Sequence, residues 1–148
     1  MYKVEKEFDY QGYHCLITFN EIGYMCGYID IPEDNYFYDK RFAQINDEHI
    51  LSIPLSYAGT VLPREDGHYW IGFTCDERGD KPDVNRVKEI WGEKAMVLTF
   101  LNMQKLPILP RTGTIRTVEY VEEKIKRLVS EVQNENRRQN TWITIQNV

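Results

Sequence analysis

The segment RTGTIR, residues 111–116, has the residue types of a small anion site. It leads directly into the longest helical pattern of the chain, and a helix start presents unpaired N–H groups and a partial positive charge. Arginine adds a fork of parallel hydrogen-bond donors that suits phosphate. Arg111 and Arg116 are therefore predicted to contact a phosphate-containing ligand.

The same segment has a purely structural interpretation. Thr114 or Thr117 can cap the helix while both arginines pair with surface acids. Glu119 lies in the first helical turn, where its charge opposes a bound anion. The chain contains neither GxxxxGK[ST] nor GxGxxG, so neither common nucleotide fingerprint is present.

Aromatic residues in YWIGF, residues 69–73, could hold a base or a ribose. Strand alternation sends Trp70 and Gly72 to one face and the other three residues to the opposite face, and glycine lets a ligand approach the backbone closely. Alternating aromatics in a strand are more often part of a protein core than a stacking platform. Tyr24 and Tyr57 have the same two interpretations.

The residue spacings do not support metal or covalent catalysis. The loop DERGD, residues 76–80, resembles a calcium loop only superficially, because Arg78 takes the third ligand position and no glutamate takes the twelfth. His68 and Cys75 are separated by about 23 Å of extended chain, so they meet only if the strand folds back. The cysteines are odd in number and include no CxxC pair: Cys15, Cys26 and Cys75. We expect inert cysteines, no metal, no cofactor and no catalytic residue.

Composition limits the function classes further. The chain has 148 residues, 42% hydrophobic and 28% charged, which predicts one globular domain over residues 1–148. Its net charge of −5 argues against general binding to duplex nucleic acid. The charged N-terminus and the lack of a long apolar run predict neither a secretion signal nor a membrane span. With its unpaired cysteines, the protein is expected in the cytoplasm.

Strand patterns dominate the N-terminal half. Lys3–Tyr10 and Tyr13–Phe19 flank Gln11-Gly12, a connection typical of a two-residue hairpin, and Tyr24–Ile31 follows as a third strand. The first part is therefore predicted to be an antiparallel β-meander. Residues 32–49 show no dominant period and are predicted to form a long surface loop, suited to a lid or a subunit contact.

The middle of the chain alternates between patterns. Ile50–Tyr57 and Tyr69–Cys75 are predicted to be strands, the first an edge strand because it contains Pro54. Asp83 stands at a helix N-cap position before a short helical pattern that ends near Gly92.

Helical patterns dominate the C-terminal half. Lys94–Gln104 is apolar without a clear period, so strand stays open, but we favour helix. The clearest element runs from Thr117 to about Arg138, with an apolar stripe that suits either the sheet or a second copy of the helix. Thr141–Ile145 alternates like a strand and would form an adhesive edge. These features predict a homo-oligomer with an α+β fold: an N-terminal antiparallel β-meander or sheet, packed with a long C-terminal helix and one or two shorter helices.

Several local motifs are similar to those of a known family. They are Tyr13-His14-Cys15, Cys26-Gly27-Tyr28, Leu55-Ser56-Tyr57-Ala58-Gly59, Trp70-Ile71-Gly72-Phe73-Thr74-Cys75-Asp76 with Gly79-Asp80, and Arg116-Thr117-Val118-Glu119-Tyr120-Val121. In these the chain resembles the phage-encoded Thoeris anti-defence proteins, which act as sponges for cyclic ADP-ribose isomers made by bacterial TIR enzymes. Where the family pattern has a second aromatic beside Trp70 and a histidine after Asp76, this chain has Ile71 and Arg78.

The resemblance implies a phage protein that sequesters its ligand without cleaving it in the bacterial cytoplasm. The ligand would be a cyclic ADP-ribose isomer or a cyclic oligonucleotide. The aromatics from Trp70 to Phe73 would form an adenine-stacking wall, and Arg116 would contact a phosphate in the same hollow. Together with the residue patterns, this predicts a set of ligand contacts: Tyr24, Tyr57, Trp70, Phe73, Asp76, Arg111, Arg116 and Tyr120.

An alternative function is inhibition of a host defence enzyme through protein–protein contact. This hypothesis rests on the acidic, tyrosine-rich composition of the chain. It requires Tyr36, Phe37 and Tyr38 to be exposed on the surface.

Overall fold

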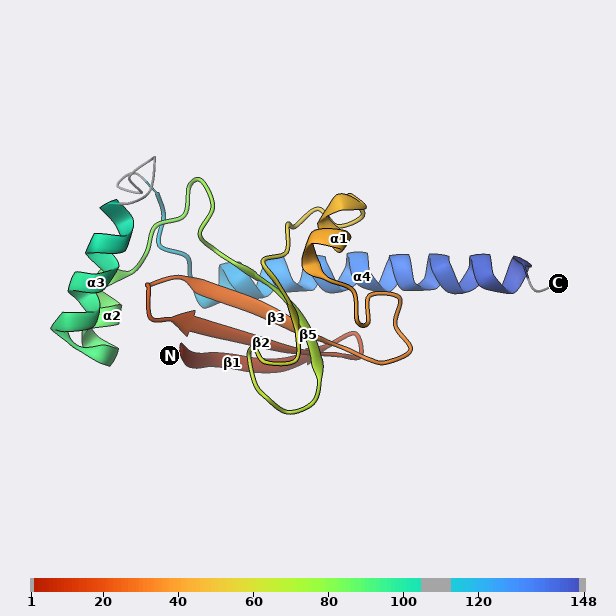
Figure 1. Cartoon of the computed structure of the whole chain (residues 1–148), viewed down its shortest axis with the longest axis horizontal. Coiled ribbons are helices and arrows are strands. Elements are labelled where there is room, and N and C mark those ends of the chain that lie inside the picture. The colour runs from red at the N-terminus through yellow and green to blue at the C-terminus, as the bar shows by residue number, and fades with distance from the viewer. Residues whose placement is uncertain (1, 105–112, 147–148) are drawn as a thin grey trace.

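A five-stranded antiparallel sheet forms the centre of the molecule (Figure 1). The computed structural model describes residues 2–104 and 113–146. In the sheet order β1-β2-β3-β5-β4, the strands are β1 Tyr2–Tyr10, β2 Tyr13–Asn20, β3 Met25–Ile31, β5 Tyr69–Thr74 and β4 Tyr57–Gly59. Gln11 and Gly12 both have positive φ, 49° and 84°, as a type I′ hairpin turn requires. The predicted meander is confirmed.

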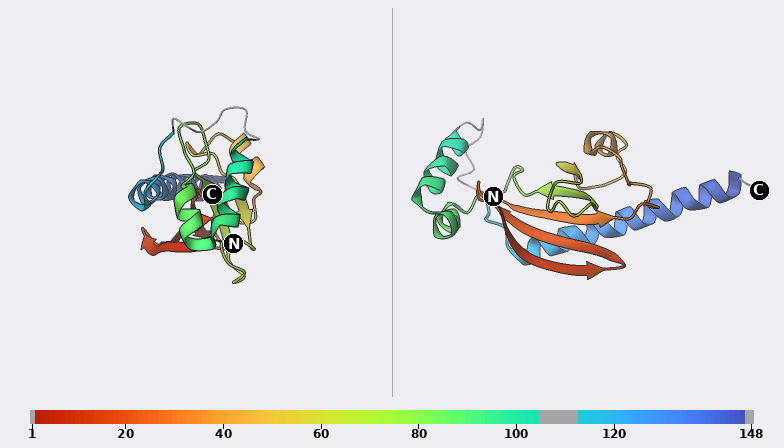
Figure 2. Two further views of the ribbon diagram at one scale, coloured as in Figure 1. Left: turned by 90° about the vertical axis from the view of Figure 1, so that its left-hand side faces the viewer. Right: turned by 60° about the horizontal axis from the view of Figure 1, so that its bottom comes forward.

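One face of the sheet, the helix face, is covered by α4, Val118–Gln146, which runs along it (Figures 1 and 2). Alternate β2 residues point to this face and are buried. They meet an equally buried stripe on α4: Val121, Ile125, Leu128, Val129 and Val132. Of the two predicted uses of this stripe, packing on the sheet is the one observed.

The segment predicted as a loop, residues 32–49, contains a short helix, α1 Phe42–Asp47. The prediction missed it because a six-residue helix with one buried side chain, Ile45, is too short to show a period. The predicted strand Ile50–Tyr57 is also wrong, since β4 begins only at Tyr57. The side-chain amide of Asn46 accepts a hydrogen bond from the Leu55 backbone N–H at 2.9 Å and donates one to the Leu55 carbonyl at 2.8 Å. The backbone of Leu55 is thereby satisfied without a neighbouring strand.

The expected exposed aromatic patch is absent from this segment. Phe37 is fully buried in the core, and Tyr36 and Tyr38 are half-buried against it. Buried Asn35 orders the turn by accepting a hydrogen bond from the Phe37 backbone N–H at 3.0 Å. The alternative hypothesis of an inhibitory surface therefore lacks the exposed aromatic it required.

Two helices pack together at one end of the sheet: α2 Val84–Trp91 and α3 Glu93–Gln104 (Figure 1). The Asp83 carboxylate caps α2 by accepting from the Arg86 backbone N–H at 3.2 Å, as predicted. The helical prediction for the apolar run before Gln104 is confirmed.

The C-terminal tail is helical, so the predicted strand at Thr141–Ile145 is wrong. Figure 1 shows this end of α4 extending past the sheet, where it adjoins no strand edge. Continued helix supplies each residue with a backbone hydrogen bond, and the hydroxyls of Thr141 and Thr144 donate to carbonyls one turn back at 2.9 Å. Within the described ranges, no helix has the length and apolarity needed to cross a membrane.

Close packing around Gly72 leads to a stability prediction. An added Cβ there would meet the Tyr28 ring and lie 2.7 Å from the Gly27 backbone carbonyl oxygen, which the β3–β5 pairing holds in place. Gly72→Ala is therefore expected to lower the free energy of unfolding by about 1–3 kcal/mol. Urea denaturation measures this change, and a loss below about 0.5 kcal/mol would show that the strand relaxes freely.

Candidate functional site at the start of α4

Two loops converge where α4 begins. The Cys75 N–H donates to the Met25 carbonyl at 2.8 Å and fixes the end of β5 against β3. The Thr114 N–H donates to the Gly79 carbonyl at 2.8 Å, and the Lys81 N–H donates to the Thr114 carbonyl at 2.9 Å. These bonds hold the loop after β5 beside the residues that lead into α4.

An ion pair orients Arg116 at this junction. Its Nε donates to the Asp80 carboxylate at 2.6 Å and its Nη2 to the Gly79 carbonyl at 3.4 Å, while the guanidinium lies 4.3 Å from the Tyr120 ring centroid. Asp80 is almost completely buried and also accepts from the Glu77 backbone N–H. The hydrogen bond that Arg116 donates to Asp80 raises the pKa of Arg116. Because a guanidinium has five N–H donors, this arrangement leaves donors for a ligand.

A second cation lies farther along the same helix. The Lys124 Nζ is 4.8 Å from the Phe73 ring centroid, and the Phe73 ring itself is buried over Gly27. Arg116, Tyr120 and Lys124 recur at four-residue spacing, which places them on one side of the helix start. Phe73 is thus a core residue that also attracts a cation.

The charges of two carboxylates act on the Tyr24 phenol. Burial, followed by the charges of Asp76 and Asp80, raises the pKa of Tyr24. Desolvation, with the negative charges of Glu77 and Asp80, also raises the pKa of Asp76. Tyr24 therefore stays a neutral hydrogen-bonding group at neutral pH.

We call this group the α4-start cluster: Tyr24, Phe73, Asp76, Asp80, Arg116, Tyr120 and Lys124. Five of its residues were predicted as ligand contacts, and the structure places them in one region: Tyr24, Phe73, Asp76, Arg116 and Tyr120. Asp80 and Lys124 were not among the predicted ligand contacts. The four-residue spacing from Arg116 was a signal for Lys124, whereas the pairing of Asp80 with Arg116 has no local signal.

A hollow of about 20 Å³ lies beside Tyr24 and Arg116, and it shares lining residues with a larger neighbouring pocket. That pocket has a volume of about 460 Å³, within the range that holds small ligands. Its wall includes Phe100 on α3, which is 48% exposed, together with Lys81 and Ile115. An apolar wall therefore adjoins the α4-start cluster, and the rim that they share carries both Lys81 and the Asp83 carboxylate that caps α2.

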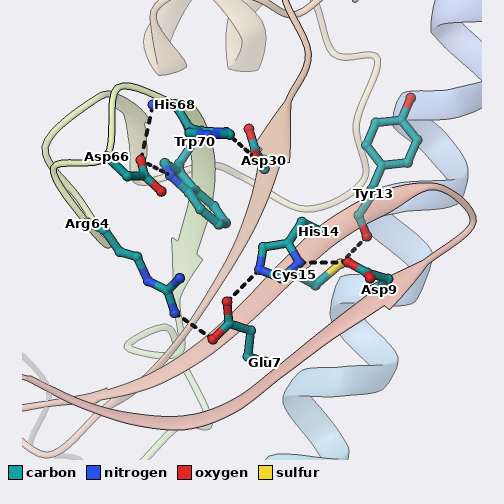
Figure 3. Close-up of polar contacts among 10 residues, drawn as sticks. All are labelled: Glu7, Asp9, Tyr13, His14, Cys15, Asp30, Arg64, Asp66, His68 and Trp70. Atoms are coloured by element: carbon teal, nitrogen blue, oxygen red, sulfur yellow. Dashed lines mark hydrogen bonds and ion pairs between the residues drawn. The ribbon is translucent and has the colours of Figure 1, made fainter.

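Trp70 lies elsewhere, on the open face of the sheet opposite α4 (Figure 3). Tyr57 packs against the same small cluster as Trp70. The Trp70 indole is 1% exposed and donates to Asp66 at 3.3 Å, and the Tyr57 hydroxyl accepts from two backbone N–H groups of the following loop. The predicted wall of Trp70 with Phe73 does not exist within one chain. Residues three apart in a strand point to opposite faces.

The remaining predictions concern the helix start. Arg111 falls outside the described residues. The Thr117 hydroxyl accepts from the Tyr120 backbone N–H at 3.1 Å and caps α4, and Arg116 pairs with an acid. The structural interpretation is therefore correct for these two residues, and Arg116 keeps donors beyond its ion pair.

The three cysteine thiols are poorly placed to act as nucleophiles. Cys15, Cys26 and Cys75 are buried, and burial raises the pKa of Cys15 and of Cys75 to about 12, so these thiols stay protonated. Within residues 2–104 and 113–146, no group of three or more His, Cys, Asp or Glu side chains is arranged to hold a metal ion.

Comparisons with known proteins give no match to a family model, a curated protein or a solved structure.

Proposed function

We propose that this protein binds a small nucleotide-type signal, of the cyclic ADP-ribose class, and sequesters it intact. The supporting observation is the pocket of about 460 Å³ that joins an exposed aromatic wall to the cationic edge of the α4-start cluster. A nucleotide combines a flat ring with phosphates, and these two surfaces match its two parts.

The proposed orientation follows from the surfaces. The base lies against Phe100 and Ile115, where an exposed ring and an aliphatic chain are available. The phosphates point toward Lys81 and Arg116, which line the pocket and the adjoining hollow. Asp80 and Tyr120 hold the guanidinium in place before the ligand arrives, so little side-chain entropy is lost on binding.

Capture is favoured over turnover by the chemistry of the same residues. Asp80 is engaged by Arg116 and the Glu77 N–H, and the nearby Cys75 thiol is protonated and buried. Neither is available to abstract a proton or attack a phosphate. Tight binding needs only the donors and the ring.

We further propose that the protein works as a homo-oligomer in the bacterial cytoplasm. The support is apolar surface at both ends of the molecule, on Val97, Leu98 and Leu101 of α3 and on Trp142 and Ile143 of α4. Such side chains are normally covered by another protein surface.

Isothermal titration with cyclic ADP-ribose isomers tests the proposal. Phe100→Ala is expected to weaken binding by about 10-fold or more, because a stacked base contributes roughly 1–3 kcal/mol. Phe42→Ala is the matched control, since Phe42 is 42% exposed on α1 and lies outside the pocket. Its affinity should stay within about 2-fold of the original protein.

The charged edge has its own pair of variants. Arg116→Lys keeps the charge but loses the fork, so affinity should fall, whereas Arg127→Gln changes an exposed cation on the same helix and should have no effect. Native mass spectrometry of each sample reports subunit number and retained ligand. Absence of heat for every isomer contradicts binding, and recovery of cleaved ligand after denaturation contradicts sequestration.

A further inference from the structure

Residues 60–68, which we call the strap, cross the open face of the sheet. The strap leaves β4, and its Arg64 reaches across to Glu7 of β1 at 2.6 Å (Figure 3). The Tyr2 hydroxyl of β1 donates to the Pro63 carbonyl. At the other end the His68 Nδ1 lies 2.6 Å from Asp30 of β3. The face beneath the strap carries a small buried cluster: Leu16, Cys26, Tyr28 and Trp70.

His14 occupies the centre of this polar network. Its Nδ1 lies 2.6 Å from the Asp9 carboxylate and its Nε2 lies 2.6 Å from the Glu7 carboxylate. A neutral imidazole has one N–H, so it cannot donate to both acids; the imidazolium can. The Glu7 carboxylate also accepts a hydrogen bond from Arg64. His14 and the strap are therefore held by the same side chain, Glu7.

We propose that the proton on His14 fastens the strap, and that its loss at alkaline pH frees the Arg64 end and opens the face carrying Trp70. With the proton present, the two acids of β1 are balanced by the two cations His14 and Arg64. Without the His14 proton, one of the two carboxylates faces an imidazole lone pair. Glu7, which anchors Arg64, is then no longer held in place by His14.

Two further carboxylates share a pocket with His14. Asp30 lies across the sheet and pairs with His68, and both line a pocket of about 360 Å³ with His14 and Glu33. The nearby carboxylates therefore favour a cation at His14. Consistently, hydrogen bonding to the Asp9 carboxylate, and then to that of Glu7, raises the pKa of His14 above its usual 6.5.

The pH window follows from the two pKa values. A raised pKa in the folded state means that the contribution of His14 is complete below pH 6.5 and disappears as the pH rises through the raised value. Arg64 and His14 lower the pKa of Glu7 to about 2, so the anchor stays ionised well into acid. The strap is therefore closed from mild acid to neutral pH and opens on the alkaline side.

Opening changes what the molecule can contact. Trp70 is 1% exposed under the strap, and its ring edge contacts the His14 ring at a centroid distance of 6.0 Å. A ligand or partner that stacks on Trp70 reaches it only after the strap lifts. This gating is independent of the proposed ligand site, which lies across the sheet near α4.

Fluorescence quenching tests the strap directly. The protein has three tryptophans, so Trp91→Phe with Trp142→Phe leaves Trp70 as the sole reporter. Acrylamide is uncharged, and its quenching of Trp70 should rise several-fold between about pH 6 and about pH 9.5. Far-UV circular dichroism should stay constant across this range.

Variants of the network distinguish opening from a general loss of structure. His14→Gln and Arg64→Gln should both give strong quenching already at mild acid pH, whereas His49→Gln, which changes an exposed histidine outside the network, should keep the original profile. If His14→Gln does not fold, Arg64→Gln decides the question. A pH-independent quenching constant, or one that rises only together with loss of circular dichroism, overturns the proposal.

Discussion

Replacing Ile125 with alanine is expected to lower the free energy of unfolding by about 3–5 kcal/mol. Ile125 is fully buried on α4, and its side chain packs over Gly27, where an added Cβ would lie 2.8 Å from the isoleucine Cγ1. The surrounding strands are paired on both sides and cannot close over the space left behind. A cavity therefore remains at the helix–sheet contact, and its cost adds to the lost burial.

Chemical denaturation followed by circular dichroism measures the change. Arg127→Ala is the control on the same helix, because Arg127 is exposed and lies outside both the core and the apolar end of α4, and it should change the stability by about 0.5 kcal/mol or less. Equal effects at the two positions would show that α4 does not pack on the sheet as described.

The second large effect concerns Asp80 and Arg116. Arg116→Ala is expected to cost about 3 kcal/mol, because it leaves a nearly buried carboxylate without its cation. Asp80→Ala should cost less, since the guanidinium it leaves behind is partly exposed and stays over the Tyr120 ring. The double variant should cost less than the sum of the two, because the buried charge is then absent.

A double-mutant cycle on unfolding free energies provides the measurement. The coupling between the two sites should be about 1–3 kcal/mol. Arg127→Ala, combined with Asp80→Ala, is the control pair and should be additive, since Arg127 is exposed on the next turns of the helix. Additivity of the Asp80 and Arg116 changes would mean that the ion pair does not hold the loop after β5 to α4.

The two predictions bear on the proposed function in different ways. Ile125 supports the frame, so its loss should reduce stability while a folded fraction keeps its ligand affinity. Arg116 has both roles, through its ion pair and through the donors left for a ligand. Arg116→Lys separates the roles, because it keeps a cation beside Asp80 but removes the fork geometry.

Local sequence determined most of the elements. Positive φ at Gln11 and Gly12 suits the hairpin, and period-two alternation assigned the β2 face that α4 covers. The sequence also predicted the apolar stripe of α4 and the N-cap at Asp83. Each of these signals extends over a few neighbouring residues, so these elements could be predicted without knowledge of contacts between distant parts of the chain.

Tertiary structure decided the features for which local signals were weak or misleading. Thr141–Ile145 alternates like a strand, yet it has no strand edge to pair with and continues α4. The single buried residue of α1, Ile45, matters only because the core accepts it. In both cases the available packing partner, rather than the local pattern, selected the conformation.

The functional groups divide in the same way. The sequence, through its motif resemblance, predicted Arg116, Tyr120 and Phe73 as contacts of one ligand, but it wrongly joined Phe73 to Trp70, which lies on the other face of the sheet. It did not indicate that Asp80 would engage Arg116, or that Glu7, His14 and Arg64 would form one network. Those contacts join segments distant along the chain, and only the order of strands in the sheet and the path of the strap bring them within hydrogen-bonding distance.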